Sequence, residues 1–215
     1  MLIVLAHQKG GVGKSTVAWN LAVTFQNKGY HVELIDLDTQ QTLFYTNEIR
    51  KQRAKKKPLR LIRYEKTDDF KRYLKEDDET RLAVIDVGGF DSDMSRLAIA
   101  FADLVITPVS DRSFELLGLK SFEKVVAAIS HVIDETVVVR VLLNNINPRK
   151  TRLEELKAFI EKSPHFHLMQ TVLRTRADYD KSVAKGKSVI EHKRESKAAN
   201  EIRTLVREIK DILHI

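Results

Sequence analysis

The chain has 215 residues, 43% of them hydrophobic, with a net charge of +7 and a pI near 9.5. It contains no cysteine, which excludes disulfides, cysteine-ligated zinc and iron–sulfur clusters and fits a reducing compartment. Neither a run of 18 apolar residues nor a signal peptide is recognisable, so we expect a cytoplasmic protein without a membrane span.

The length suits a single domain over residues 1–215. The positive charge is interpreted either as a bias towards a polyanionic partner such as nucleic acid or as a solvated lysine-rich surface.

Short apolar runs alternate with helical patterns along the chain. The expected strands are Leu2–Ala6, His31–Ile35, Leu59–Arg63, Leu82–Asp86, Leu104–Pro108, Val137–Asn144 and a short one near Leu168–Val172. The expected helices are Lys14–Lys28, Asp68–Glu76, Asp93–Phe101, Glu115–Ile133, Thr151–Lys162 and Ser196–Leu213. Because strands and helices alternate, we predict an α/β fold with three layers, doubly wound around a mostly parallel sheet.

Two segments lack a clear apolar pattern. Arg50–Lys57 (RKQRAKKK) is a run of charge, which is interpreted either as a solvated helix end or as an interaction surface. Thr175–Lys187 has few apolar residues and contains Gly186, so we expect an irregular connection before the last helix.

The first loop carries the strongest motif, KGGVGKST, placed between a strand and a helix. Its glycines allow consecutive backbone N–H groups to surround phosphate oxygens, and the helix N-terminus favours anions. This is a phosphate-binding loop (P-loop), and it predicts a P-loop NTPase fold that binds ATP and Mg²⁺. The predicted nucleotide ligands in this loop are Lys9, Gly10, Gly11, Val12, Gly13, Lys14, Ser15 and Thr16.

Within this site, Lys14 is expected to reach the β- and γ-phosphates and the Ser15 hydroxyl to bind Mg²⁺. Asp86 follows four apolar residues at a strand end, as a Walker B aspartate that holds the Mg²⁺ water shell does. Asp36 and Asp38 end another strand. Carboxyl ends of parallel strands open onto the ligand crevice, so we expect these aspartates at the site, where one of Asp36 and Asp38 points at the ligand while the other caps or positions a loop.

KGGVGKST and the following LIDLDTQ resemble the deviant Walker A ATPases of the ParA/MinD class. The resemblance implies that Lys9 reaches across an ATP-sandwich homodimer to the partner's phosphates. It also implies that Asp38 orients the attacking water, so that Lys9, Lys14 and Asp38 form the catalytic set. Asp36 matches the first aspartate of that stretch and completes the metal set with Ser15 and Asp86; Thr39 stands where the class usually has proline.

Later segments extend the resemblance over nearly the whole chain. Thr107-Pro108-Val109 and Gly118 match a Pro-Val…Gly pattern, and Asn144 falls where relatives contact the adenine, so Pro108 and Asn144 are assigned to the nucleotide. The closing segment is matched by Arg176, Tyr179, Gly186, Val189, Glu191 and the stretch Ala198–Ile202.

The chain begins at its first strand, so it resembles the compact plasmid- and chromosome-partition ATPases that lack an N-terminal helix-turn-helix. The resemblance implies slow ATP hydrolysis to ADP and phosphate, stimulated by a centromere-binding adaptor protein. It also implies non-specific DNA binding by the ATP dimer, on the nucleoid. The candidate DNA-binding residues are Arg149, Lys150, Arg152, Arg174, Arg176, Lys185 and Lys187.

Two alternatives remain. The last helix is amphipathic, as in MinD-like membrane-associated or cargo-positioning ATPases, but its polar face carries both charges, so we expect it to cover the sheet without stable membrane association. The second alternative is a small-molecule ligase or kinase on the same P-loop fold. It predicts that ATP turnover depends on an organic substrate and is unaffected by DNA.

Overall fold

The computed structural model describes the whole chain except residues 77, 79, 90, 111–114, 148 and 150–152. Seven strands are seen in the described part: β1 (Leu2–Leu5), β2 (His31–Asp36), β3 (Arg60–Ile62), β4 (Arg81–Asp86), β5 (Leu104–Val109), β6 (Val139–Ile146) and β7 (Phe166–Arg174). They form one sheet in the order β3-β2-β4-β1-β5-β6-β7, with every pair parallel. The predicted parallel α/β sheet is confirmed.

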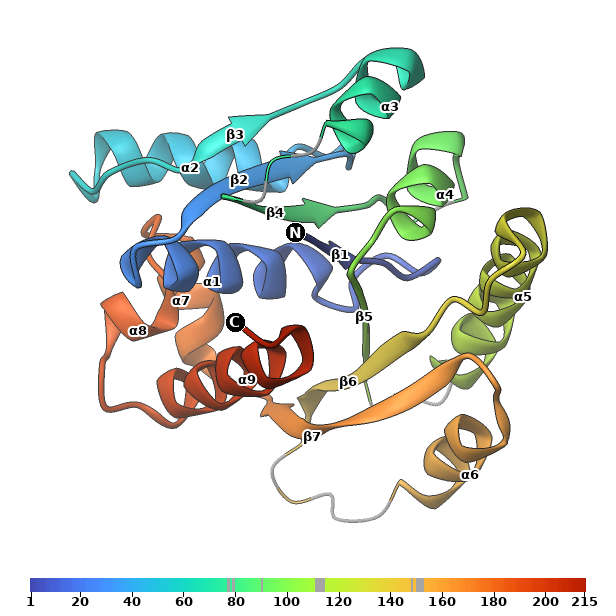
Figure 1. Cartoon of the computed structure of the whole chain (residues 1–215). Coiled ribbons are helices and arrows are strands. Elements are labelled where there is room, and N and C mark those ends of the chain that lie inside the picture. The colour runs from blue at the N-terminus through green and yellow to red at the C-terminus, as the bar shows by residue number, and fades with distance from the viewer. Residues whose placement is uncertain (77, 79, 90, 111–114, 148, 150–152) are drawn as a thin grey trace.

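Helices connect these strands (Figure 1). They are α1 (Lys14–Asn27), α2 (Thr42–Gln52), α3 (Thr67–Lys75), α4 (Asp93–Ala100), α5 (Glu115–Ile133), α6 (Glu154–Lys162), α7 (Ala177–Val183), α8 (Val189–His192) and α9 (Lys197–Leu213). Helices α1 and α9 contribute to a core on one face of the sheet, and α3 to α6 contribute to a second core on the other face. This is the predicted three-layer, doubly wound arrangement.

Alternating residues of the central strand serve both cores. Ile3 and Leu5 of β1 pack into the first, whereas Leu2 and Val4 pack into the second. Both sets are buried because helices cover both faces, which explains why the strand is a continuous apolar run.

Two sequence predictions need correction. Residues 42–52 form α2, which was not predicted. Arg50, the first residue of the charged run, is only 1% exposed, whereas residues 51–57 lie at and beyond the end of α2 and are exposed except for the half-buried Ala54. Part of Thr175–Lys187, expected to be irregular, forms α7. Both helices bury polar groups, such as Asn47 in α2 and Ser182 in α7, so their buried faces lack the apolar periodicity that indicates a helix.

The sheet brings the strand ends together at one edge. Asp36 at the end of β2 is in register with Asp86 at the end of β4, and Asp86 is also in register with Leu5, the last residue of β1. The loop that follows β1 is the P-loop, so the predicted site residues meet at the carboxyl edge, where parallel sheets bind ligands.

Candidate functional site

The P-loop joins β1 to α1 through glycines with positive φ. Gly11 has φ +77° and Gly13 has φ +95°, and Gly13 is the N-cap of α1. A Cβ added to Gly13 would lie 2.3 Å from Nδ2 of Asn144. Only glycine satisfies both constraints without strain, so α1 begins with its free N–H groups open to an anion.

Lys14 begins α1 and is buried beneath this loop. Its Nζ donates a hydrogen bond to the Lys9 carbonyl oxygen at 3.3 Å. Burial lowers the pKa of Lys14, while the charges of Asp86 and Asp38 raise it. The ammonium group is therefore held by its own loop and lies in the field of two carboxylates, in position for an anion that enters the loop.

Asp86 is fully buried at the end of β4. Neither carboxylate oxygen has a hydrogen-bond partner of acceptable geometry among the described residues, although the Ser15 hydroxyl lies close enough to lower its pKa. Burial is the largest effect and raises the pKa of Asp86 to about 7, although the Ser15 hydroxyl and the charge of Lys14 both lower it. A buried acceptor without a partner is costly, and a cation with its water shell would satisfy it.

Asp36 and Asp38 shape the loop that follows β2. Asp36 accepts backbone N–H bonds from Asp38 at 3.1 Å and Phe44 at 3.4 Å, and Asp38 accepts one from Gln40 at 3.0 Å. Burial raises the pKa of Asp36, whereas those backbone bonds lower it. Asp36 thus fixes the turn into α2 and positions the half-buried Asp38.

Across the described residues, no group of three or more histidine, cysteine, aspartate or glutamate side chains is arranged to hold a metal ion. Mg²⁺ binds through one or two carboxylates together with substrate phosphates and waters, so this donor set fits an ion that arrives with a nucleotide.

Lys9 is anchored at the front of the loop by its backbone. Its N–H donates to Nδ1 of His7 at 2.9 Å. A Cβ on Gly118 of α5 would lie 3.0 Å from Cε1 of His7 and 3.7 Å from Cβ of Lys9. The close approach of α5 therefore favours glycine here, which gives the Gly118 of the sequence pattern a packing role.

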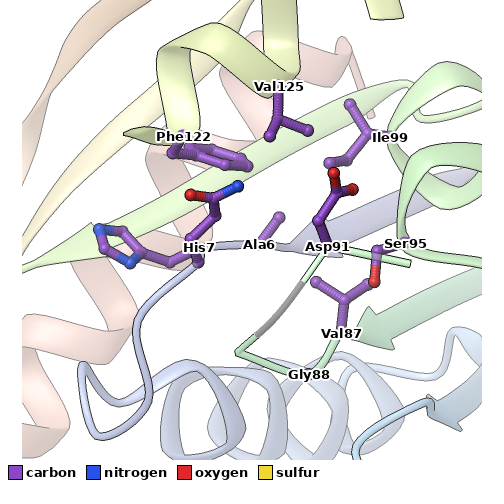
Figure 2. A pocket seen from close by; sticks show the side chains of 10 residues that line it. Ala6, His7, Val87, Gly88, Asp91, Ser95, Ile99, Phe122 and Val125 are labelled. Atoms are coloured by element: carbon purple, nitrogen blue, oxygen red, sulfur yellow. The ribbon is translucent and has the colours of Figure 1, made fainter. Parts of the chain in front are cut away.

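The loop after β4 contacts the P-loop directly. A Cβ on Gly89 would lie 3.0 Å from the backbone nitrogen of Gly10. Beside this contact, Figure 2 shows His7 and Phe122 on one side of a small cavity and Asp91 and Ile99 on the other. The cavity holds only about 10 Å³, so it has no room for an organic ligand.

A cleft of about 440 Å³ opens on the other side of the P-loop. It is lined by Gly11, Val12, Gly13, Thr16, Asn144, Asn145, Arg174, Thr175, Arg176, Ala177, Tyr179 and Asp180. Asn144 Nδ2 donates to the Val12 carbonyl oxygen at 2.7 Å, which brings Asn144 to the P-loop. Pro108 is buried inside β5 and is not among the cleft residues, so its assignment to the nucleotide stays a prediction.

The wall of this cleft includes residues that motif analysis did not assign to the nucleotide, among them Asn145, Thr175 and Asp180. The wall is held by Glu201 of α9, which pairs with Arg176 at 2.8 Å and accepts a bond from the Tyr179 hydroxyl at 3.1 Å. Burial and Glu201 raise the pKa of that hydroxyl. The closing-segment pattern contained these residues, but it did not indicate that they border the P-loop.

The candidate DNA-binding residues do not gather in one place. Arg174 and Arg176 line the cleft, and Arg149 is exposed in the turn after β6. Lys185 is exposed and Lys187 half-buried beyond the end of α7. Lys150 and Arg152 lie outside the described residues.

The last helix packs inward. Ile202, Leu205, Val206 and Ile209 of α9 are fully buried in the first core, with contacts to β7 and α1. Among the described residues, no helix is long and apolar enough to cross a membrane. The apolar face of α9 is therefore occupied by the protein's own core.

Sequence comparison identifies one family over most of the chain. The profile of the CobQ/CobB/MinD/ParA nucleotide binding domain matches residues 3–189. Protein ParA of Rhizobium radiobacter is 26% identical over 148 residues, which is 68% of this chain and 65% of that protein. The chromosome-partitioning ATPase Soj of Thermus thermophilus is 58% identical over 38 residues, 18% of this chain and 15% of Soj. The matches thus span less than two thirds of these relatives.

Solved structures show the same fold at low identity. McdA of Cyanothece in an ATP complex has a TM-score of 0.74 at 15% identity, covering all of this chain and 96% of that one. A proposed plasmid partition protein of Borrelia burgdorferi bound to AMPPNP has a TM-score of 0.64 at 19% identity, covering 99% of this chain and 98% of that one. MinD of Aquifex aeolicus has a TM-score of 0.70 at 16% identity, covering 98% of this chain and 97% of that one.

Proposed function

The chain belongs to the CobQ/CobB/MinD/ParA nucleotide-binding family, and from this premise we propose that it is an ATP-hydrolysing switch for DNA partition. One observation carries the proposal. Two lysines share the P-loop, with Lys14 Nζ bonded to the carbonyl oxygen of Lys9 while the Lys9 backbone is held by His7. The resemblance to the deviant Walker A ATPases assigns Lys14 to the protein's own phosphates and Lys9 to the nucleotide of the partner.

The nucleotide fits the described geometry. The triphosphate lies against the N–H groups of the P-loop and α1, and the base and ribose enter the cleft beside Asn144. Ser15 and Asp86, and Asp36 by resemblance, would hold the Mg²⁺, which would neutralise part of the charge of the phosphates. The unpartnered Asp86 carboxylate supports this assignment, because a hydrated cation would give it the partner that it lacks.

Hydrolysis is then assigned to the protein's own groups. Asp38 holds a water by hydrogen bonding, in line with the γ-phosphorus. As the water oxygen bonds to phosphorus, the bond to the β,γ-bridging oxygen breaks, and ADP and phosphate leave. Lys14 and the partner's copy of Lys9 stabilise the charge on the transferring group.

We propose one ATPase domain over residues 1–215, which is cytoplasmic and joins its copy into a homodimer when ATP is bound. A cation at the dimer face interacts more strongly with a γ-phosphate than with ADP, so hydrolysis loosens the dimer. The ATP dimer binds DNA non-specifically, and a centromere-binding adaptor protein accelerates hydrolysis. The partition relatives support this reading.

The second candidate is a MinD-like, membrane-associated positioning ATPase, which the similarity to MinD of Aquifex aeolicus supports equally at the level of fold. It would require a membrane-binding segment. The apolar face of α9 is buried against β7 and α1, so α9 would have to leave the core to bind a membrane. We therefore favour partition.

The test is DNA binding by the purified protein with ATP, ADP or no nucleotide, at two salt concentrations, beside a Lys9→Ala variant. We expect salt-sensitive binding only with ATP, and its loss in Lys9→Ala, which still binds nucleotide through Lys14. Absence of DNA binding in every nucleotide state would refute the proposal, and ATP-dependent flotation with anionic liposomes would support the MinD-like candidate.

A further inference from the structure

A buried ion pair links α2 to the segment that closes the chain. The Arg50 guanidinium bonds the Glu191 carboxylate twice, at 2.8 and 3.0 Å, with Arg50 1% and Glu191 10% exposed. It also donates to the carbonyl oxygens of Lys57 at 2.8 Å and Gly186 at 3.1 Å. A Cβ on Gly186 would lie 2.3 Å from the Arg50 nitrogen, so the two segments touch at the backbone.

The link brings together two basic segments that are far apart in the sequence. Between residues 51 and 63 there is no acidic residue. The side chains that the link places in this region are Lys51, Arg53, Lys55, Lys56, Lys57, Lys185 and Lys187, all exposed except the half-buried Lys187. Arg50 pins residue 57 directly, and Lys56 N–H also bonds the Arg50 carbonyl oxygen at 3.3 Å. The loop thus presents its cations from a fixed backbone.

We propose that residues 51–57 and 185–187 form one surface, the basic face, that binds the phosphates of DNA in the proposed partition function, on which this inference rests. Glu191, the carboxylate that Arg50 contacts between the two segments, is paired with that guanidinium. Partial burial and then the charge of Lys185 lower the pKa of His192, with a smaller contribution from Lys187 and against Asp178, so these lysines act on the neighbouring α8. Clustered cations of one sign on a rigid backbone suit a polyanion.

The basic face is also joined to the nucleotide cleft. Helix α7 begins with Ala177, Tyr179 and Asp180 in the cleft and ends at Val183, just before Lys185. Trp19 of α1 holds the far end, because its indole N–H donates to the Lys187 carbonyl oxygen at 3.0 Å. In Figure 1, α7 and α8 lie beside α1 at the same end of the molecule as the end of α2. Helix α7 therefore connects the nucleotide cleft to the basic face.

The experiment measures fluorescence anisotropy of a labelled 40-bp random-sequence duplex with ATP and Mg²⁺, across a salt series. One variant carries Lys55→Ala, Lys56→Ala and Lys57→Ala, and a second carries Lys185→Ala and Lys187→Ala. The matched control carries Lys66→Ala, Lys71→Ala and Lys75→Ala, three exposed lysines on and before α3. Fluorescent ATP binding by each variant reports that its fold and nucleotide site are intact.

We expect the first variant to bind DNA at least about ten-fold more weakly. For each protomer that contacts the duplex, it should lower the salt slope by about 2 to 3, because each lost phosphate contact removes about 0.9 from that slope. The second variant should lower the slope by about 1 to 2 for each such protomer. The control should match the wild type.

A basic face that only protects the edge strand β3 from aggregation gives a different result. In that case both variants bind DNA as the wild type does, which overturns the basic face while the partition proposal stands. Equal losses in the variants and the α3 control would also overturn it, because total charge alone would then explain binding. If the wild type binds no DNA in any nucleotide state, both proposals fall.

Discussion

The Arg50–Glu191 pair should dominate the stability of the closing segment. Glu191→Ala leaves the guanidinium of Arg50, which is 1% exposed, without its counter-charge. Removing one partner of a buried pair costs about 3–5 kcal/mol. Glu191 also completes the capping box of α8 by accepting from Ser188 N–H at 3.1 Å, whose loss adds about 1 kcal/mol. We expect the free energy of unfolding to fall by about 4–6 kcal/mol.

Arg50→Met should cost less, because Glu191 keeps its bonds from Ser188 and from Asn27 at 3.2 Å. The double variant Arg50→Met with Glu191→Leu should lose less than the sum of the single losses, by at least about 1 kcal/mol, because it leaves no buried charge unpaired. Urea unfolding followed by circular dichroism measures all three.

The control is the Arg96–Asp91 pair, in which both side chains are substantially exposed, at 41% and 32%. Arg96→Met should cost less than about 1 kcal/mol, since exposed pairs contribute little. The reasoning is refuted if Glu191→Ala lies within about 0.5 kcal/mol of the wild type, or if the two losses simply add in the double variant.

Three further outcomes concern the nucleotide site. Gly13→Ala should weaken the binding of fluorescent ATP at least ten-fold, because Gly13 has φ +95° and the added Cβ would collide with Asn144. The control is Gly29→Ala, because Gly29 has φ +93° but open space around it. This control should lower the free energy of unfolding by about 1 kcal/mol and leave the affinity for ATP unchanged. Asp38→Asn should bind ATP normally but hydrolyse it at least about 100-fold more slowly in a phosphate-release assay. If this variant hydrolyses ATP as fast as the wild type does, Asp38 does not position the attacking water. Burial raises the pKa of Asp86 from 3.8 to about 7, so between these pH values the folded protein holds a proton that the unfolded chain has lost. The free energy of unfolding of the nucleotide-free protein should therefore fall as the pH rises from 5 to 7. Urea unfolding at several pH values measures this dependence, and Asp86→Asn should make it flatter.

Sequence alone predicted the elements whose buried faces are apolar. The β1 run, the P-loop and Asp86 all follow from local patterns, because a parallel strand between two cores is continuously apolar and a phosphate loop needs glycine at fixed positions. The resemblance assigned Asn144 to the nucleotide, but its contact with Val12, 132 residues away, was not predicted. No local rule specifies such a distant contact.

Helix α2 was not predicted from the sequence, and the reason is the burial of polar residues. Helix α2 turns Asn47 and Arg50 inward, and these residues are satisfied by Leu59 and Glu191 respectively, so the hydrophilic sequence of α2 resembles a surface segment. A buried polar residue is stable only when its partners are in place. Those partners lie 12 and 141 residues away, so the burial of Arg50 is a property of the assembled fold.

The strand order has a consequence for how the protein is made. Strand β1 leaves the ribosome first, yet its neighbours are β4 and β5, and Leu2 is in register with Ala83 while Ile3 is in register with Leu104. The central strand must therefore wait until almost half of the chain has been synthesised. Until then its apolar run is exposed to chaperones and to other nascent chains. The loop that begins at Lys9 acquires its supporting walls only afterwards, so nucleotide capture marks the completion of the sheet.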